Sequence, residues 1–298
     1  MNLRFWGVRG SIPTPEPDRL RYGGNTTCLE IGSPGAQEAV IIDCGSGIRA
    51  LGDELLQRQV SRIHILLSHF HWDHLQGLPS FAPLFQHGVE IVFYTNREAD
   101  QARSLFDIQM ADPFFPLPFA EAGSQTEFRH MECGKPFQAG SLTVQAFALY
   151  HPQGAVGFRL ESDGQVLVHA SDHEHGNPEI DAGLIRAARN ADMLVMDAQY
   201  TPEEYAGKVG WGHSSYAHAA QAAQSAGVGR LLLFHHDPAH NDLFLDEMLA
   251  DAKTLFNSTE MACEGKVLNI AQAGAPLPSE PPDSGGSKKM FVPSSDSG

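Results

Sequence analysis

Residues 68–79 read Ser68-His69-Phe70-His71-Trp72-Asp73-His74-Leu75-Gln76-Gly77-Leu78-Pro79, directly after the aliphatic run Ile63-His64-Ile65-Leu66-Leu67. The aliphatic run alternates little, so it predicts a strand in a sheet that is covered on both faces. Four groups able to bind a metal then fall within six positions, where the strand ends. We therefore expect the rest of the chain to act as a scaffold for this segment.

The spacing of these four groups predicts two metal ions. His69 and His71 are two positions apart, so both imidazoles can point the same way and bind one cation. Asp73 and His74 come where the chain turns toward a helix expected from Leu75, and their side chains should point elsewhere. Scattered histidines are the alternative, since the chain has 15 His in 298 residues. The ordered pattern His-x-His-x-Asp-His is far more restrictive than a nearby pair.

At these residues the chain resembles the metallo-β-lactamase superfamily, whose signature is this His-x-His-x-Asp-His. Two further runs, Gly-x-Arg-Gly-Ser-Ile-Pro at 7–13 and Gly-Gly-Asn-Thr-Thr-Cys at 23–28, are similar to those of the branch with ribonuclease Z-like and cyclic-nucleotide phosphodiesterase-like enzymes. The family contains many hydrolases. The resemblance therefore implies a fold and a metal site before it implies a substrate.

Composition narrows the class of protein and of partner. With 42% hydrophobic and 19% charged residues the chain is typical of a globular protein, and no apolar run approaches the roughly 18 to 20 residues that cross a bilayer. The first residues contain no apolar signal segment, so we expect a cytoplasmic protein without membrane contact. Lys plus Arg total 20 against 36 Asp plus Glu, a net charge of −16. This charge repels long nucleic acids and favours a small phosphodiester substrate; a homodimer stays open.

The pattern of apolar residues predicts strands that alternate with helices. Helices are expected at 48–57, 97–110, 181–190, 216–226 and 243–256, and buried strands include 39–43, 90–95, 142–149, 165–171, 193–196 and 231–234. Helices outside two stacked sheets make an αββα sandwich, an α/β (α+β) fold with two mixed β-sheets. We expect one domain over residues 1–273, followed by a disordered tail, 274–298, rich in Pro, Ser, Asp and Gly.

Three more ligand candidates follow predicted strands and match the family's later motifs: His151, Asp172 and His235. His236 is next to His235 and competes for the same place; His235 is preferred because it follows the buried strand directly. The resemblance implies a dinuclear centre, with one metal held by His69, His71 and His151, the other by Asp73, His74 and His235, and both bridged by Asp172. Two divalent ions are expected, zinc first, with manganese or iron as alternatives.

Two residues are expected to support or perform the chemistry beside the ligands. Asp43 closes a strand in the family's first motif, which implies that it orients ligands without touching a metal; an ordinary turn aspartate is the alternative. His213, in Gly-Trp-Gly-His-Ser-Ser, resembles the ribonuclease Z-like histidine motif, which implies that it protonates a leaving alcohol or helps to bind the scissile phosphate. The alternative for His213 is an exposed residue beside a helix cap made by Ser214 or Ser215. Asp73 and His213 are the expected catalytic residues.

Several groups are candidates for contact with substrate. His173, beside Asp172, and His236 are expected to face the substrate or the rim of the site, with simple surface exposure as the alternative. Phe114 and Phe115 lie in a loop with three prolines, 112–119, which cannot form regular hydrogen bonds. That loop is either an apolar wall for a flat base or a hydrophobic plug over the core.

The first functional hypothesis is a dinuclear metal-dependent phosphodiesterase that attacks a small or cyclic nucleotide through a metal-activated hydroxide. A ribonuclease Z-like endonuclease is the second, although the acidic charge and the missing basic arm before His151 argue against it. A thioester or lactam hydrolase has the same metal core. A non-catalytic nucleotide-binding sensor remains the alternative from a different class.

Overall fold

The computed structural model describes residues 1–32 and 36–270. Most of the predicted domain, 1–273, falls within this range, and the predicted tail, 274–298, lies outside the described residues. None of the helices within the described range has the length and apolar character needed to cross a membrane.

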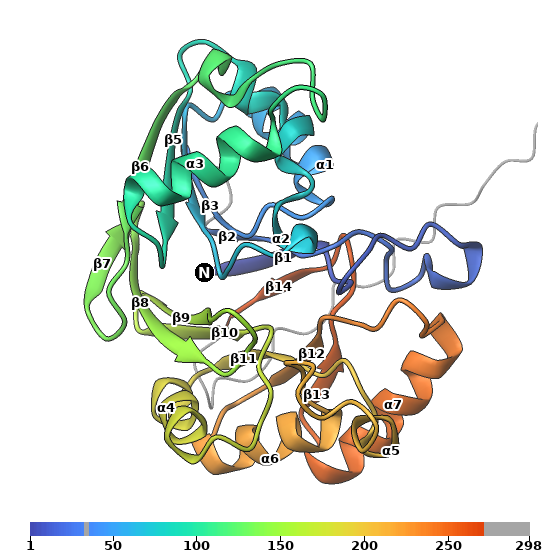
Figure 1. Cartoon of the computed structure of the whole chain (residues 1–298). Coiled ribbons are helices and arrows are strands. Elements are labelled where there is room, and N and C mark those ends of the chain that lie inside the picture. The colour runs from blue at the N-terminus through green and yellow to red at the C-terminus, as the bar shows by residue number, and fades with distance from the viewer. Residues whose placement is uncertain (33–35, 271–298) are drawn as a thin grey trace, which may run out of the picture.

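Two seven-stranded sheets face each other, and helices cover both outer faces (Figure 1). The N-terminal sheet has the strand order β14-β1-β2-β3-β4-β5-β6, and the C-terminal sheet has the order β13-β12-β11-β10-β9-β8-β7. Each sheet mixes parallel and antiparallel pairs. The predicted αββα sandwich is confirmed.

The strands of the N-terminal sheet are β1 (Asn2–Gly7), β2 (Cys28–Gly32), β3 (Glu38–Ile42), β4 (Arg62–Leu66), β5 (Glu90–Thr95), β6 (Gln125–His130) and β14 (Val267–Asn269). Those of the C-terminal sheet are β7 (Pro136–Ala139), β8 (Leu142–Leu149), β9 (Ala155–Ser162), β10 (Gln165–Ala170), β11 (Met193–Asp197), β12 (Leu231–Phe234) and β13 (Thr259–Met261). The predicted strands correspond to elements of these sheets. The short strands β7, β13 and β14 were not predicted.

The helices that cover the N-terminal sheet are α1 (Ile48–Gln57) and α3 (Ala99–Gln109), and those that cover the C-terminal sheet are α4 (Pro178–Ala188), α6 (Tyr216–Ala226) and α7 (Asp242–Leu255) (Figure 1). Two single-turn helices, α2 (Trp72–Leu75) and α5 (Pro202–Tyr205), lie in the connecting loops. Short 3-10 turns occur at Pro17–Arg19, Leu78–Ser80, Ala82–Phe85 and Phe119–Glu121.

Two helices begin three residues before the expected position. The helix expected over 181–190 begins at Pro178. The helix expected to begin at Leu75 is α2, which spans Trp72–Leu75 and contains both Asp73 and His74. The amide of Gln76 donates to the carbonyl of Trp72 at 2.7 Å, which closes this single turn. His71 stays extended as its N-terminal flanking residue. The metal-binding motif thus bends from extended chain into a helix within five residues, which aims its two halves in different directions.

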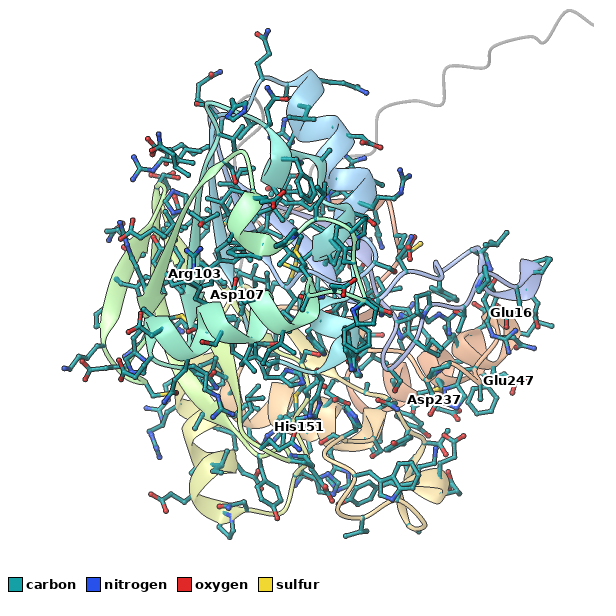
Figure 2. The ribbon with its side chains drawn as sticks, turned by 45° about the horizontal axis from the view of Figure 1, so that its top comes forward. Glu16, Arg103, Asp107, His151, Asp237 and Glu247 are labelled. Atoms are coloured by element: carbon teal, nitrogen blue, oxygen red, sulfur yellow. The ribbon has the colours of Figure 1, made fainter. Side chains whose placement is uncertain are left out.

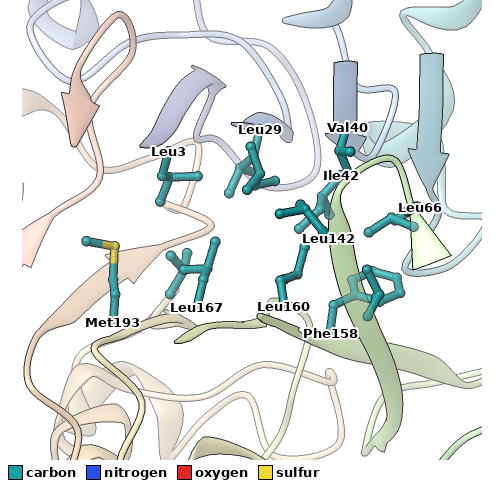
Figure 3. Close-up of a cluster of buried hydrophobic side chains, with 14 of the residues drawn as sticks. Leu3, Leu29, Val40, Ile42, Leu66, Leu142, Phe158, Leu160, Leu167 and Met193 are labelled. Atoms are coloured by element: carbon teal, nitrogen blue, oxygen red, sulfur yellow. The ribbon is translucent and has the colours of Figure 1, made fainter. Parts of the chain in front are cut away.

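The layer between the sheets is the largest block of buried apolar side chains. Leu3, Leu29, Val40, Ile42 and Leu66 from the N-terminal sheet meet Leu142, Phe158, Leu160, Leu167 and Met193 from the C-terminal sheet (Figure 3). Because these side chains are almost fully buried, no strand can shift by one residue against its hydrogen-bonded neighbour without turning its apolar side chains away from the core. The ends of the strands are therefore held at fixed positions relative to one another.

A polar side chain is buried within this apolar surrounding. His169 of β10 has no exposed surface, and its ring lies 5.6 Å from that of Phe234 and 6.4 Å from that of Phe158. Neither ring nitrogen has a hydrogen-bond partner among the described residues. Burial lowers the pKa of His169 from 6.5 to about 4, because the charged imidazolium would lose its hydration.

Replacing His169 with Phe should make the stability of the protein less sensitive to acid. The folded pKa lies below the unfolded value, so the unfolded chain binds a proton first as pH falls below 6.5. The stability contributed by neutral His169 is complete above that pH and is lost down to about pH 4. Between pH 7 and 4.5 the wild type should lose about 2 kcal/mol more than H169F in urea unfolding of metal-free protein. Equal losses would contradict this account.

Candidate metal centre

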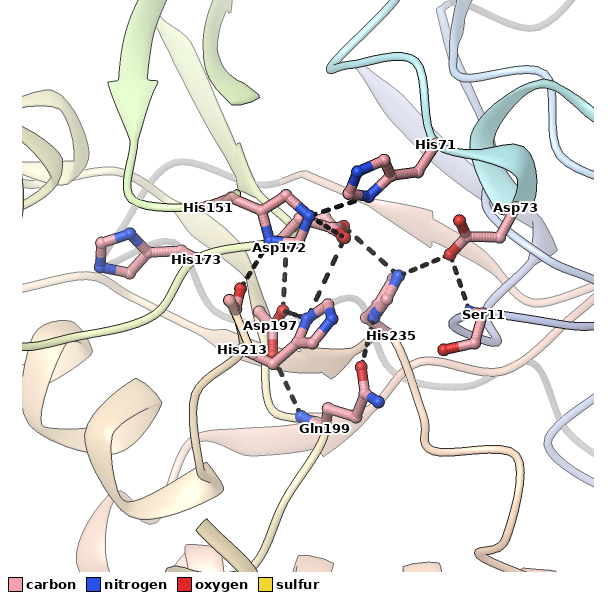
Figure 4. A network of polar contacts seen from close by, with 12 residues as sticks. Ser11, His71, Asp73, His151, Asp172, His173, Asp197, Gln199, His213 and His235 are labelled. Carbon is pink, nitrogen blue, oxygen red and sulfur yellow. Dashed lines mark hydrogen bonds and ion pairs between the residues drawn. The ribbon is translucent and has the colours of Figure 1, made fainter. Parts of the chain in front are cut away.

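The candidate residues come together at the edge of the sandwich where strands of both sheets end. Strands β3 and β4 run parallel, as do β10, β11 and β12, and β8 points the same way as β10 because each is antiparallel to β9. The carboxyl ends of such strands meet at one edge, where open sheets commonly bind ligands. The residues that follow these ends are Asp43, His69, His71, His151, Asp172 and His235, with Asp197 as the last residue of β11. Figure 4 shows His71, His151, Asp172, Asp197 and His235 gathered at this edge.

Three histidines form one group of ligand atoms. His69, His71 and His151 each offer a ring nitrogen, and these nitrogens all lie within 4.8 Å of one another. Nδ1 of His71 and Nε2 of His151 are 3.0 Å apart. In Figure 2 His151 is labelled below Arg103 and Asp107 of α3. His69 and His71 follow β4 of the N-terminal sheet and His151 follows β8 of the C-terminal sheet, so the group joins the two halves of the sandwich.

A second group contains Asp73, His74, Asp172 and His235, all buried and again within 4.8 Å of one another. Nε2 of His74 lies 3.2 Å from Oδ1 of Asp172, and Nε2 of His235 lies 3.3 Å from the same oxygen. The other oxygen of Asp172, Oδ2, is 3.7 Å from Nε2 of both His69 and His151. One carboxylate thus faces both groups, one oxygen to each.

These groups fit divalent cations. Two nitrogens on a tetrahedral zinc ion, each about 2.0 to 2.1 Å from the metal, lie about 3.3 Å apart, and the separations above are close to that value. Nε2 of His69 and Nε2 of His74 are buried without a hydrogen-bond partner among the described residues, although both face the cluster. Imidazole and carboxylate ligands suit zinc, manganese or iron.

The electrostatics of the second group also favour a bound cation. Burial would raise the pKa of Asp172, but the nearby His235 and His74 hold it well below its ordinary value. Burial would lower the pKa of His235, yet Asp172 and Asp73 outweigh it and raise that pKa to about 9. The pKa of His74 is raised well above its ordinary value by Asp172 and Asp73 in the same way, against burial. The cluster holds positive charge strongly, so metal ions would compete with protons for it.

Hydrogen bonds from outside the cluster fix which nitrogen each histidine presents. Nδ1 of His74 bonds Oδ2 of Asp43 at 2.8 Å, and the backbone amide and hydroxyl of Ser68 both donate to that carboxylate. Nδ1 of His151 bonds the carbonyl of Gly212 at 2.8 Å, and Nδ1 of His235 bonds Oε1 of Gln199 at 3.0 Å. Each of these rings therefore points Nε2 into the cluster, the arrangement usual for metal-binding histidines.

The backbone around the cluster is strained at three residues and approaches the ring of His235 closely at Gly10. Asp43, Asp172 and His235 have φ values of 62°, 60° and 63°, a left-handed conformation that residues with side chains rarely adopt and that gathers at functional sites. Gly10 leaves no room for a side chain, since a methyl group there would lie 2.4 Å from Cε1 of His235. The amide of the next residue, Ser11, donates to Oδ2 of Asp73 at 2.7 Å.

His213 stands at the border of the cluster, bound to a carboxylate that sequence reasoning missed. Its Nδ1 bonds Oδ2 of Asp197 at 2.7 Å, and Oδ1 of Asp197 accepts from the amide of Ser214 at 3.2 Å. His213 is largely buried, not exposed, and its ring is 5.1 Å from that of His151. Asp197 ends a buried strand as Asp43 follows one, and that position was the available signal.

The structure places the remaining candidates away from the cluster. His173 is buried, accepts from the amide of Tyr150 through Nδ1 and pairs with Asp181 through Nε2; in Figure 4 its ring lies apart from the others. His236 bonds the carbonyl of Ala262 and packs edge-on against Tyr22. Phe115 packs partly buried against the core beneath α1 and α3, as a plug would, whereas 77% of Phe114 is exposed.

The chain is similar to known proteins in sequence and in fold. A family model described as the Beta-lactamase superfamily domain matches residues 38–236. The chain is similar to "Ribonuclease Z" of Bradyrhizobium sp. (strain ORS 278), with 25% identity over 90% of this chain and 99% of the relative. It resembles the metallo-beta-lactamase fold protein YhfI of Bacillus subtilis with a TM-score of 0.70 and 19% identity, covering 90% of this chain and 98% of that one. It also resembles a diphosphatase of the PhnP family with a TM-score of 0.63 and 17% identity, covering 91% and 98%.

Replacing Gly10 with Ala should weaken metal binding by displacing the ring of His235. We expect about 10- to 100-fold weaker zinc affinity, the range typical when a group that positions a ligand is lost, measured by competition with a chromophoric chelator. Gly183→Ala is the matched control, because the nearest atom to its added methyl is 3.7 Å away in α4. Unchanged zinc affinity in G10A would show that His235 does not bind the metal or is not held in place by Gly10.

Proposed function

The chain belongs to the β-lactamase superfamily, and from that premise we propose that it is a dinuclear metal-dependent hydrolase that cleaves phosphodiesters of small or cyclic nucleotides. The observation that carries this proposal is the position of Asp172, whose two oxygens face two separate groups of ligand atoms. The proposed ligands of one metal are His69, His71 and His151, those of the other are Asp73, His74 and His235, and Asp172 is shared.

The chemistry proposed at this centre requires a nucleophile, charge neutralisation and a proton donor. Two divalent ions bound there would make water nucleophilic near neutral pH and offset the negative charge that develops on a phosphoryl group. Asp73 is proposed to orient the attacking water through its carboxylate, which the backbone amide of Ser11 holds in place. Although burial works the other way, His74 and His235 keep the pKa of Asp73 below its ordinary value, so the carboxylate stays ionised.

His213 is proposed to protonate the leaving alkoxide. With Nδ1–H donated to Asp197, the ring presents Nε2 as the atom that gives up a proton. The Asp197 carboxylate would stabilise the positive charge of the imidazolium before transfer, as a carboxylate beside a general acid does. A leaving group that is a weak base needs no such proton, so the importance of His213 should depend on the leaving group.

A ribonuclease Z-like endonuclease is the second candidate function. The relatives named ribonuclease Z and ribonuclease BN align over about nine tenths of this chain, and the diphosphatase is similar at the level of fold. The net charge of −16 favours a small substrate over a long polyanion. The net charge therefore favours hydrolysis of a small phosphodiester over cleavage of RNA.

A panel of substrates tests the choice. Zinc- or manganese-loaded protein should hydrolyse bis(p-nitrophenyl) phosphate and at least one cyclic mono- or dinucleotide. Hydrolysis is measured by chromatography of the products. Cleavage of precursor tRNA alone would replace the proposal with the ribonuclease. Hydrolysis of a thioester or lactam alone would overturn the phosphodiesterase assignment, and nucleotide binding without any turnover would indicate a sensor.

His213→Ala should lower kcat for a nucleotide substrate by about 100- to 10,000-fold, the usual contribution of a general acid, while metal content stays the same. The loss should be much smaller with bis(p-nitrophenyl) phosphate, because p-nitrophenolate leaves without a proton. Asp197→Asn should show the same dependence on leaving group. His173→Gln is the control, since its ring pairs with Asp181 instead. An equal loss on both substrates would remove His213 as the proton donor.

A further inference from the structure

Three large aromatic side chains are exposed directly beside buried residues of the metal centre. Trp72 is 68% exposed, Trp211 62% and Tyr150 44%. In the sequence, Trp72 lies between His71 and Asp73, Tyr150 precedes His151, and Trp211 precedes Gly212. We call Trp72, Tyr150 and Trp211 the aromatic rim.

Contacts within the site bring these three segments together. Nδ1 of His151 bonds the carbonyl of Gly212 at 2.8 Å, and Nε2 of the same ring lies 3.0 Å from Nδ1 of His71. A residue next to each member of the aromatic rim is therefore either in contact with His151 or His151 itself. Trp72 belongs to α2 of the N-terminal half, whereas Trp211 lies in the loop before α6 of the C-terminal half. The rim thus borders the metal centre from both halves.

The loop that carries Trp211 is held rigidly in spite of its exposure. The carboxylate of Glu174, itself 3% exposed, accepts from the amides of Gly210 at 2.7 Å and Gly212 at 2.8 Å. The hydroxyl of Tyr205 donates to the same carboxylate at 3.0 Å. The buried carboxylate of Glu174 thus holds the backbone on both sides of Trp211. The exposure of the indole is therefore a property of an ordered loop.

A cation packs beside the indole of Trp211. Nζ of Lys208 lies 5.6 Å from the ring centroid of Trp211 and 4.4 Å from that of Tyr200, within the range of cation–π attraction. Lys208 also pairs with Asp237 at 3.4 Å, so it is anchored on the protein side. Lys208 therefore lies beside the indole, most of which stays open to solvent.

The exposed tryptophans beside the metal centre indicate a surface that binds a ligand. Large apolar side chains gathered on a soluble surface commonly mark a binding site, and flat aromatic faces bind nucleobases by stacking without regard to their hydrogen-bond pattern. The strongly acidic chain offers little attraction to a long polyanion. Stacking is a way to hold a nucleotide that does not depend on positive charge.

We propose that the aromatic rim binds the nucleobase of the substrate by stacking, chiefly through Trp72 and Trp211. This inference rests on the proposed function for the location of the phosphate, which would lie at the metal centre while the base lies outside it. Stacking on the aromatic rim would make the substrate a nucleoside phosphodiester instead of an alkyl or sugar phosphodiester. Tyr150 completes the rim between the two tryptophans in sequence and is expected to contribute less, because it is more buried.

Binding of AMP and of ribose 5-phosphate to zinc-loaded protein tests the proposal without any turnover, since both are monoesters that differ by the base. Isothermal titration should give about 10-fold or greater preference for AMP, as expected from one stacked base. W72A and W211A should each reduce this preference toward one, while W211F retains most of it. Leu243→Ala, an exposed apolar residue on α7, should leave it unchanged.

Equal affinity for AMP and ribose 5-phosphate in the wild type would overturn the proposal that the aromatic rim binds the base, even if phosphodiesters are hydrolysed. A preference that survives in both W72A and W211A would overturn it as well. A base preference lost in these variants would support the rim even if no phosphodiester is cleaved, so the two proposals fail separately. Circular dichroism and zinc content of each variant must match the wild type, and W211F provides the folded comparison if W211A does not fold.

Discussion

The convergence of buried carboxylates and imidazoles on one edge of the sandwich is the constraint on which the rest depends. Isolated ionised groups are costly to bury. Asp43 and Asp73 each meet histidines and a backbone amide, and Asp172 meets histidines and the hydroxyl of Ser171. The histidines among these partners lie in segments that follow strands of both sheets. The apolar layer between the sheets therefore does more than stabilise the fold, because its fixed register holds the strand ends, and with them the ligand atoms, at the required separations.

The parts that sequence reading predicted well are those with strong local signals. Helices α1 and α6, strands β5, β8 and β12, and the metal-binding motif after β4 all have clear periodicity or spacing. Strands β13 and β14 have three residues each, too few to show a period, and they form because a neighbouring strand offers hydrogen bonds. The start of α2 was misplaced because His71 and Trp72 carry no side-chain cap that marks a helix end.

The network outside the ligands could not be predicted because its contacts are distant along the chain. Gln199 meets His235, and Ser11 meets Asp73, only after the two sheets pack together. The left-handed backbone at Asp43, Asp172 and His235 is equally invisible in the sequence, because Asp and His adopt this conformation more often than most residues but still only rarely. In each case the folded surroundings impose a conformation or partner that local preference would not choose.

One carboxyl group, that of Asp197, binds both the ring of His213 and the backbone of Asp172. Its Oδ2 accepts from the ring of His213 at 2.7 Å and from the backbone amide of Asp172 at 3.1 Å. The proposed proton donor and the carboxylate that faces both ligand groups thus share a single anchor. Loss of this carboxyl group would therefore remove one hydrogen-bond acceptor from both the ring of His213 and the backbone of Asp172.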